Sequence, residues 1–90
     1  LHFKEILLAD SHTPEDEYQK DLFWEALYMA LDELPENQRL VFVQNELDDK
    51  TLQQIALEEN VPLKTIISRK GYAVKHLRQR LNEFYSELGK

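Results

Sequence analysis

The chain has 90 residues, enough for one small domain with a single core, and its 42% hydrophobic content is typical of a folded protein. The absence of cysteine excludes disulfides and thiolate metal sites and favours a reducing cytoplasm. No apolar run approaches the roughly 20 residues that cross a bilayer, so we expect no membrane partner. The net charge of −6 argues at first against a nucleic-acid partner, but the charged residues are distributed unevenly along the chain.

The first predicted helix follows residues 1–13, which we interpret as a linker or the tail of a preceding region. Thr13 can cap a helix, Pro14 suits its first position, and the acids that follow favour the positive end of the helix dipole. Trp24 and Tyr28 widen a stripe of apolar residues at helical spacing, which we interpret as core and not as a ligand pocket. If part of this stripe stays exposed, it becomes a surface for a partner protein. The stripe consists of Phe23, Leu27, Ala30, Leu31 and Leu34.

Pro35 ends this helix and starts a second one, which the pattern predicts over roughly 35–47. The second helix is followed by a polar turn, residues 48–50. Its apolar residues are Leu40, Val41, Phe42, Val43 and Leu47.

Thr51 to Gln54 have the pattern of a capping box, in which the threonine hydroxyl and the glutamine side chain each bond the other residue's backbone amide. They open a short third helix, about 51–59, whose inward residues are Leu52, Ile55 and Ala56. Asn60 follows, and asparagine tolerates the left-handed conformation that a tight turn after a helix requires.

The fourth helix is predicted to start after Val61-Pro62 and to present an apolar stripe at helical spacing. Lys70 interrupts that stripe, and we expect its long stem to carry the charge out to water. No segment alternates as a strand does. We therefore predict an all-α domain of four helices over residues 14–90. The predicted stripe is Leu63, Ile66, Ala73, Val74, Leu77, Leu81, Phe84 and Leu88.

The third and fourth helices match the demands of a helix-turn-helix. Ala56 is small enough for the helix crossing, Asn60 suits the turn, and Ile66 can anchor the second helix. Such a helix must present side chains to the major groove and to phosphates. Residues 64–80 contain six bases and no acid, namely Lys64, Arg69, Lys70, Lys75, Arg78 and Arg80. With Ile66 inward, the outer face and its flanks hold Lys64, Thr65, Ser68, Gly71, Tyr72, Lys75 and Gln79.

Several motifs occur together at fixed spacing. Leu31 to Pro35 precede Gln38-Arg39 and Val41-Phe42, the capped segment from Thr51 ends in Ile55-Ala56, and Thr65-Ile66 precede Ser68-Arg69. With these motifs, the stretch from Leu31 to Leu81 resembles region 4 of the extracytoplasmic-function sigma factors. The upstream segment from Thr13 to Asp16 resembles the point where the linker meets region 4 in that family.

The resemblance implies a helix-turn-helix of the winged-helix-like superfamily, without a wing, that recognises the −35 element of a promoter while docked on the flap of the β subunit of RNA polymerase. Carried over to this chain, it places Ser68, Gly71 and Tyr72 nearest to base edges. Phosphates would be held by Lys64, Thr65, Arg69 and Lys75. Arg39 would hold a phosphate or brace the turn. The chain departs from the family where Ile67 stands in place of a common base and Gly71 in place of a common arginine or aromatic residue.

The sequence gives little support for metal binding or catalysis. The three histidines, His2, His12 and His76, have no ligand spacing, and the acidic clusters have no nucleophile or base beside them. We therefore expect no enzyme, no metal and no cofactor. Two alternatives stay open beside promoter recognition. One is a protein-interaction module of the same shape that binds an anti-sigma factor or polymerase, and the other is the output domain of another transcription regulator.

Overall fold

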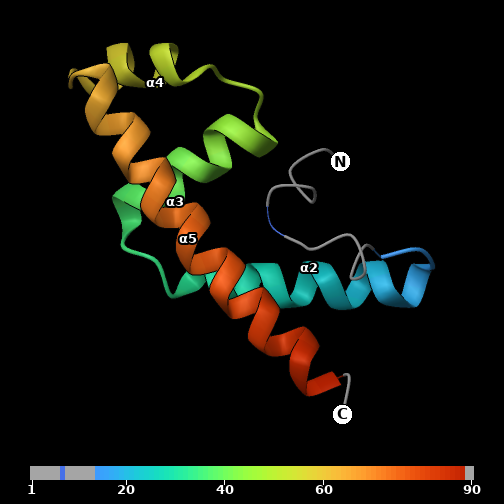
Figure 1. Cartoon of the computed structure of the whole chain (residues 1–90). Helices are drawn as coiled ribbons and strands as arrows, with labels where there is room; N and C mark the ends of the chain where they lie inside the picture. The colour runs from blue at the N-terminus through green and yellow to red at the C-terminus, as the bar shows by residue number, and fades with distance from the viewer. Residues whose placement is uncertain (1–6, 8–13, 89–90) are drawn as a thin grey trace.

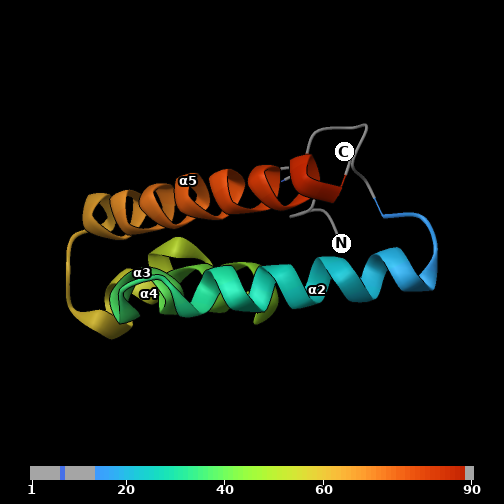
Figure 2. The ribbon, with the colours of Figure 1, turned by 90° about the horizontal axis from the view of Figure 1, so that it is seen from below.

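The computed structural model of the chain describes Leu7 and residues 14–88. This part is built from α2 (Glu17–Asp32), α3 (Glu36–Phe42), the π-helix η2 (Val43–Leu47), α4 (Leu52–Glu59) and α5 (Leu63–Leu88) (Figure 1). Over these residues there is no strand, which confirms the predicted all-α class. Figure 2 shows α5 as one layer, lying across a second layer that contains α2, α3 and α4.

Helix α2 begins later than the sequence pattern predicts. The side chain of Asp16 caps it by accepting a hydrogen bond from the backbone amide of Gln19 at 2.7 Å, so Pro14 lies before the helix and not in its first turn. An aspartate in this position satisfies an amide that has no partner within the helix and also favours the positive end of the dipole. The predicted cap Thr13 and the rest of the predicted linker, apart from Leu7, lie outside the described residues.

The predicted second helix is divided into α3 and the π-helix η2. At its end the backbone amide of Asp48 donates to the carbonyl of Val43 at 3.1 Å, and the amide of Lys50 donates to the carbonyl of Gln44 at 2.9 Å. The wider turn ends at Asp49, which has a positive φ of 59°. Asn45 supports the turn, because its side-chain nitrogen donates to the carbonyl of Lys50 at 2.7 Å. The chain is thereby redirected into α4.

Helix α4 and the turn after it have the predicted form. The Thr51 hydroxyl accepts from the Gln54 amide at 3.0 Å, and the Gln54 side chain accepts from the Thr51 amide at 2.8 Å, which confirms the capping box. Asn60 is left-handed with a φ of 58°. The amide of Val61 then bonds the carbonyl of Ala56 at 3.1 Å, so the turn that joins the two helices of the motif is closed by backbone bonds.

The core has two parts. The smaller lies where α4 crosses α5 and contains Val41, Ile55, Ala56 and Ile66, which confirms the predicted anchors of the helix-turn-helix. The larger joins α2 to the second half of α5 and also includes Leu7, which is only 2% exposed. Two predicted core residues are wrong. Tyr28 is 55% exposed on α2, and Leu63 is 41% exposed in the first turn of α5, before the helix reaches its neighbours. The largest fully buried side chains of the larger part are Phe23, Phe42, Leu7, Leu27, Leu77 and Leu81.

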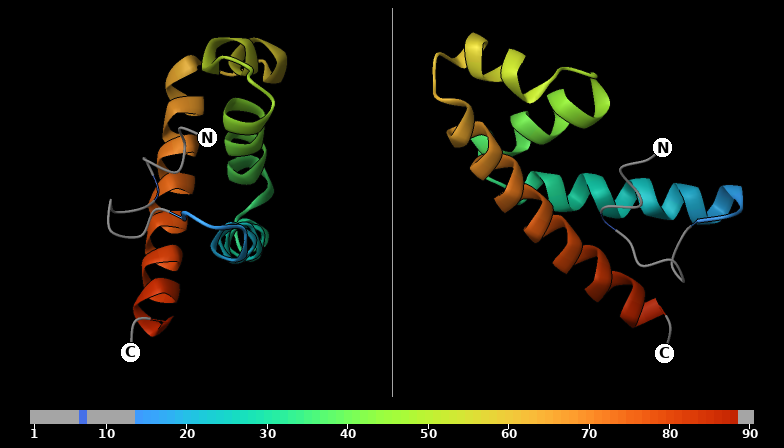
Figure 3. Two further views of the ribbon diagram at one scale, coloured as in Figure 1. Left: turned by 90° about the vertical axis from the view of Figure 1, so that its right-hand side faces the viewer. Right: turned by 45° about the horizontal axis from the view of Figure 1, so that its top comes forward.

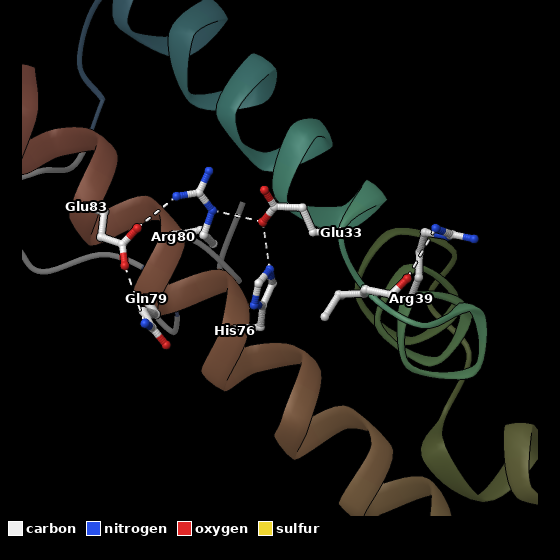
Figure 4. Close-up of polar contacts among 7 residues, drawn as sticks. Glu33, Arg39, His76, Gln79, Arg80 and Glu83 are labelled. Carbon is white, nitrogen blue, oxygen red and sulfur yellow. Dashed lines mark hydrogen bonds and ion pairs between the residues drawn. The ribbon is translucent and has the colours of Figure 1, made fainter.

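A polar cluster ties the end of α2 to the middle of α5 (Figure 4). The carboxylate of Glu33 accepts from Nε of Arg80 at 2.8 Å and lies 2.8 Å from Nε2 of His76, and Arg80 also pairs with Glu83 at 2.8 Å. The hydrogen bond from Arg80, followed by that from His76, lowers the pKa of the Glu33 carboxyl. This cluster lies where α5 crosses α2, and the first half of α5 lies beside α3 and α4, as the two views in Figure 3 show.

Candidate nucleic-acid interface

The predicted DNA-contact residues lie together on the first half of α5. Their exposure follows from helix geometry, since Ile66 and Ala73 are fully buried and fix the inward side of the helix. The basic side chains of this face therefore point away from the core. Lys64, Ser68, Gly71, Tyr72 and Lys75 are exposed, and Thr65 and Arg69 are half-buried.

One flank of this face forms a shallow hollow with α3. Two residues of α3, Asn37 and Gln38, contribute amide side chains there. Amides can donate to a phosphate or bond a base edge, so this hollow is suited to the polar surface of a duplex. The sequence analysis missed both residues, because nothing in their local spacing shows that α3 lies beside α5. The predicted residues that line the same hollow are Lys64, Thr65, Ser68, Arg69 and Tyr72.

The opposite flank forms a second hollow, which is more apolar. The two remaining predicted residues, Gly71 and Lys75, line it together with Ile67 and Val74 of α5 and with Leu52 of α4. Ile67 is 52% exposed although it is an isoleucine. The sequence analysis did not include it among the contact residues, although it occupies the outward side of the helix one turn before Gly71.

Lys70 differs from the prediction. Its ammonium is not directed out to water but pairs with the carboxylate of Glu46 and donates to the side-chain oxygen of Asn45, both in η2. The side chains of Lys70 and Glu46 are only 18% and 4% exposed. The physical reason is that η2 turns a carboxylate towards the inward side of α5, which gives the lysine a partner where its position would otherwise require an apolar residue. The pair joins the recognition helix to the turn that precedes α4.

Arg39 lies in the middle of α3 and reaches back towards the end of α2. Its Nη1 donates a long hydrogen bond of 3.5 Å to the backbone carbonyl of Leu34, and the side chain is half-buried (Figure 4). This contact spans the turn around Pro35. A bond of that length is weak, so the guanidinium keeps most of its donors for another acceptor. Whether that acceptor is a phosphate stays a prediction.

The charges that α5 contributes to the interface are positive, whereas Glu36 of α3 and Glu59 of α4 line a neighbouring hollow with Arg69. Residues 64–80 contain no acid, so no carboxylate of α5 itself repels a phosphate at this face. Not all six bases are directed outwards, however, because Lys70 pairs with Glu46 and Arg80 pairs with Glu33. The hydrogen bonds that Arg80 donates to the carboxylates of Glu33 and Glu83 raise the pKa of its guanidinium above the usual value. The face that remains is moderately basic.

Elsewhere in the described part of the chain, no group of three or more histidine, cysteine, aspartate or glutamate residues is arranged to hold a metal ion. Among the same residues, no helix has the length and apolar composition needed to cross a membrane.

The profile of one protein family, described as sigma-70, region 4, matches residues 24–77. The match covers more than half of the 90 residues and contains the second half of α2, all of α3, η2 and α4, and the part of α5 that forms the interface. The chain belongs to the sigma-70 region 4 family. No curated protein matches it.

Membership of this family agrees with the exposed, basic first half of α5 described above. A sigma-70 region 4 domain is a DNA-binding regulatory domain and not an enzyme, and it serves in recognition of the −35 promoter element and in binding to RNA polymerase. The helix-turn-helix of this region 4 domain consists of α4, the turn at Asn60 and α5.

Proposed function

We propose that this region 4 domain is the C-terminal part of an extracytoplasmic-function sigma factor, which directs transcription initiation in the cytoplasm while docked on the β flap of RNA polymerase. The observation that carries the proposal is the outer face of α5. Over residues 64–80 this face combines exposed bases and hydrogen-bonding side chains and contains no acid, next to a buried anchor that sets the helix orientation. A helix in this setting fits into the major groove of double-stranded promoter DNA.

We assign the contacts to base edges and to phosphates as the family resemblance implies. Ser68, Gly71 and Tyr72, which are all exposed on α5, are assigned to the base edges. The side chains that flank them and can donate to phosphate oxygens are Lys64, Thr65, Arg69 and Lys75. Only three of these carry a positive charge, so the fragment alone binds DNA weakly. The logarithm of its binding constant should fall with the logarithm of the salt concentration with a slope of about −3.

Selection and titration test the proposal. The full chain is used at low salt to enrich duplexes from a random-sequence pool, and the enriched duplex and a scrambled version of it are then titrated with the chain. We expect the enriched duplex to bind at least about tenfold more tightly than the scrambled one, because base contacts add to the phosphate contacts. Equal binding to both, or no enrichment, would contradict the proposal.

Charge reversal supplies a matched control. Lys75→Glu and Lys20→Glu change the net charge by the same amount, but Lys75 lies on the outer face of α5 and Lys20 lies on α2 beside Glu17. Lys75→Glu, and likewise Lys64→Glu, should weaken binding about tenfold, and Lys20→Glu should change it by less than about twofold. An equal loss in both kinds of variant would show that only the net charge matters.

A second candidate function is supported by the outer surface of α2. Tyr18, Tyr28 and Met29 are 72%, 55% and 64% exposed, and the Tyr28 ring stacks on Trp24 with centroids 5.7 Å apart. Exposed aromatic residues of this kind are frequent in protein interfaces, and an anti-sigma factor or the polymerase would be the partner. If Tyr28→Ser abolishes binding to core RNA polymerase while Lys64→Glu and Lys75→Glu leave promoter-dependent transcription intact, this domain acts mainly through protein contacts.

A further inference from the structure

Ile67 and Gly71 together form an apolar notch on the outer side of the recognition helix. They are four residues apart, so they are neighbours on the surface of α5, and both line the hollow that also contains Lys75. Ile67 is 52% exposed. A Cβ atom added at Gly71 would meet no atom of the protein within 4 Å, so the space beside the isoleucine is open to solvent.

The fold itself does not require a glycine at this position. Gly71 lies inside a 26-residue helix, where glycine is the least favourable residue after proline. Its φ is not positive, and nothing in the structure approaches it closely. A missing side chain that internal packing does not explain is useful where the backbone must come close to a ligand. The notch therefore points outwards, to whatever covers this face of α5.

The chemistry of the notch defines its occupant. In the major groove, the bases present hydrogen-bonding groups and one apolar group, which is the C5-methyl of thymine. The flank beside the notch carries Lys75 and no acid, as a surface next to a phosphate backbone requires. We infer that the notch between Ile67 and Gly71 receives the C5-methyl group of a thymine, so that this domain selects a T·A pair at one position of its site. The inference rests on the proposed promoter recognition and adds to it the feature that is recognised.

Removing a single methyl group from the DNA tests the inference directly. Each thymine of the duplex enriched by the full chain is replaced in turn by deoxyuridine, which keeps every hydrogen-bonding group and lacks only the C5-methyl. We expect one such replacement to weaken binding about fourfold, the loss that corresponds to one buried methyl group. If the enriched duplex binds specifically and no deoxyuridine replacement changes its affinity, the inference is wrong while promoter recognition stands.

A double-mutant cycle then assigns the effect to the notch. In Ile67→Ala, the deoxyuridine replacement should cost less than about twofold, because the apolar partner of the methyl group is already shortened. Met29→Ala removes a similarly exposed apolar side chain from α2 and should retain the full fourfold effect. An unchanged effect in Ile67→Ala, or an Ile67→Ala variant that binds every duplex as the wild type does, would overturn the assignment. The second result would indicate a protein partner for Ile67.

Gly71→Ala separates a role in binding from a role in folding. Because the added methyl group meets no atom of the protein and alanine is the better helix former, the variant should melt about 4–8 °C higher than the wild type. The same methyl group fills the notch and should weaken binding to the enriched duplex by about fivefold or more. Higher thermal stability with unchanged DNA affinity would refute a close approach of DNA at this position. No specific binding by the wild type would instead contradict the proposed function itself.

Discussion

Replacing Lys70 with methionine measures how strongly the buried ion pair holds the recognition helix to the preceding turn. Methionine keeps the length of the side chain but removes the charge that faces Glu46 and the donor that faces Asn45. The Glu46 carboxylate, 4% exposed, would then lose the ammonium of Lys70 in a position that water hardly reaches. Breaking a buried pair in this way typically costs 3–5 kcal/mol.

We expect the lower end of this range, about 3 kcal/mol, because the Lys70 side chain is still 18% exposed and water screens part of its charge. For a domain of this size, that loss corresponds to a melting temperature lower by about 12–24 °C. Urea unfolding and thermal unfolding followed by far-UV circular dichroism measure it.

Two further variants make the experiment decisive. Lys50→Met also removes a lysine from an ion pair, but its pair with Glu58 is exposed, so the free energy of unfolding should change by less than about 0.5 kcal/mol. The double variant Lys70→Met/Glu46→Leu replaces both buried charges and should recover most of the stability that Lys70→Met loses. A Lys70→Met variant within about 1 kcal/mol of the wild type would refute the structural role assigned to the pair.

Three other predictions follow from local features of the fold. The folded-state pKa of Glu33 lies below its usual 4.5. The stability from its pairs with Arg80 and His76 is therefore present above pH 4.5 and is lost as the pH falls through the lowered pKa. Between about pH 6 and pH 3, the melting temperature should fall less in Glu33→Gln than in the wild type. Thr51→Ala removes the cap of α4 and should cost about 1 kcal/mol in urea unfolding. Asn60→Val places a β-branched residue at a φ of 58° and should cost more than about 1 kcal/mol, whereas Asn60→Gly should be close to neutral by the same assay.

The features that the sequence predicts correctly depend on residues close together in the chain. The capping box at Thr51 spans four residues, and the left-handed turn at Asn60 depends on the tolerance of a single residue. The inward positions of Ile66 and Leu77 follow from the period of one helix, and both are fully buried. Such short-range rules also predict which side chains of α5 point outwards, although the role of each in DNA binding stays a prediction.

The features that the sequence does not predict depend on residues far apart. Whether the charge of Lys70 reaches water or an ion pair is decided by Glu46, 24 residues earlier, and by a π-helical turn that aims its carboxylate inwards. In the same way, Asn37 joins the interface only because α3 packs beside α5. Periodicity predicts which side of a helix each residue occupies, but it does not predict which groups of another helix pack against that side.

The charge of the chain shows why the position of a residue in the fold, and not only in the sequence, matters for function. Residues 64–80 carry a charge of +6, so the other residues together carry −12, the difference from the total of −6. The long axis of the molecule is 45 Å, and Figure 1 shows the acidic start of α2 on the opposite side from the start of α5. Because salt screens charges beyond about 8–10 Å, a duplex docked on the outer face of α5 experiences mainly that face. The net charge therefore affects the approach of DNA at low salt, but it is no argument against binding once the helix is in the groove.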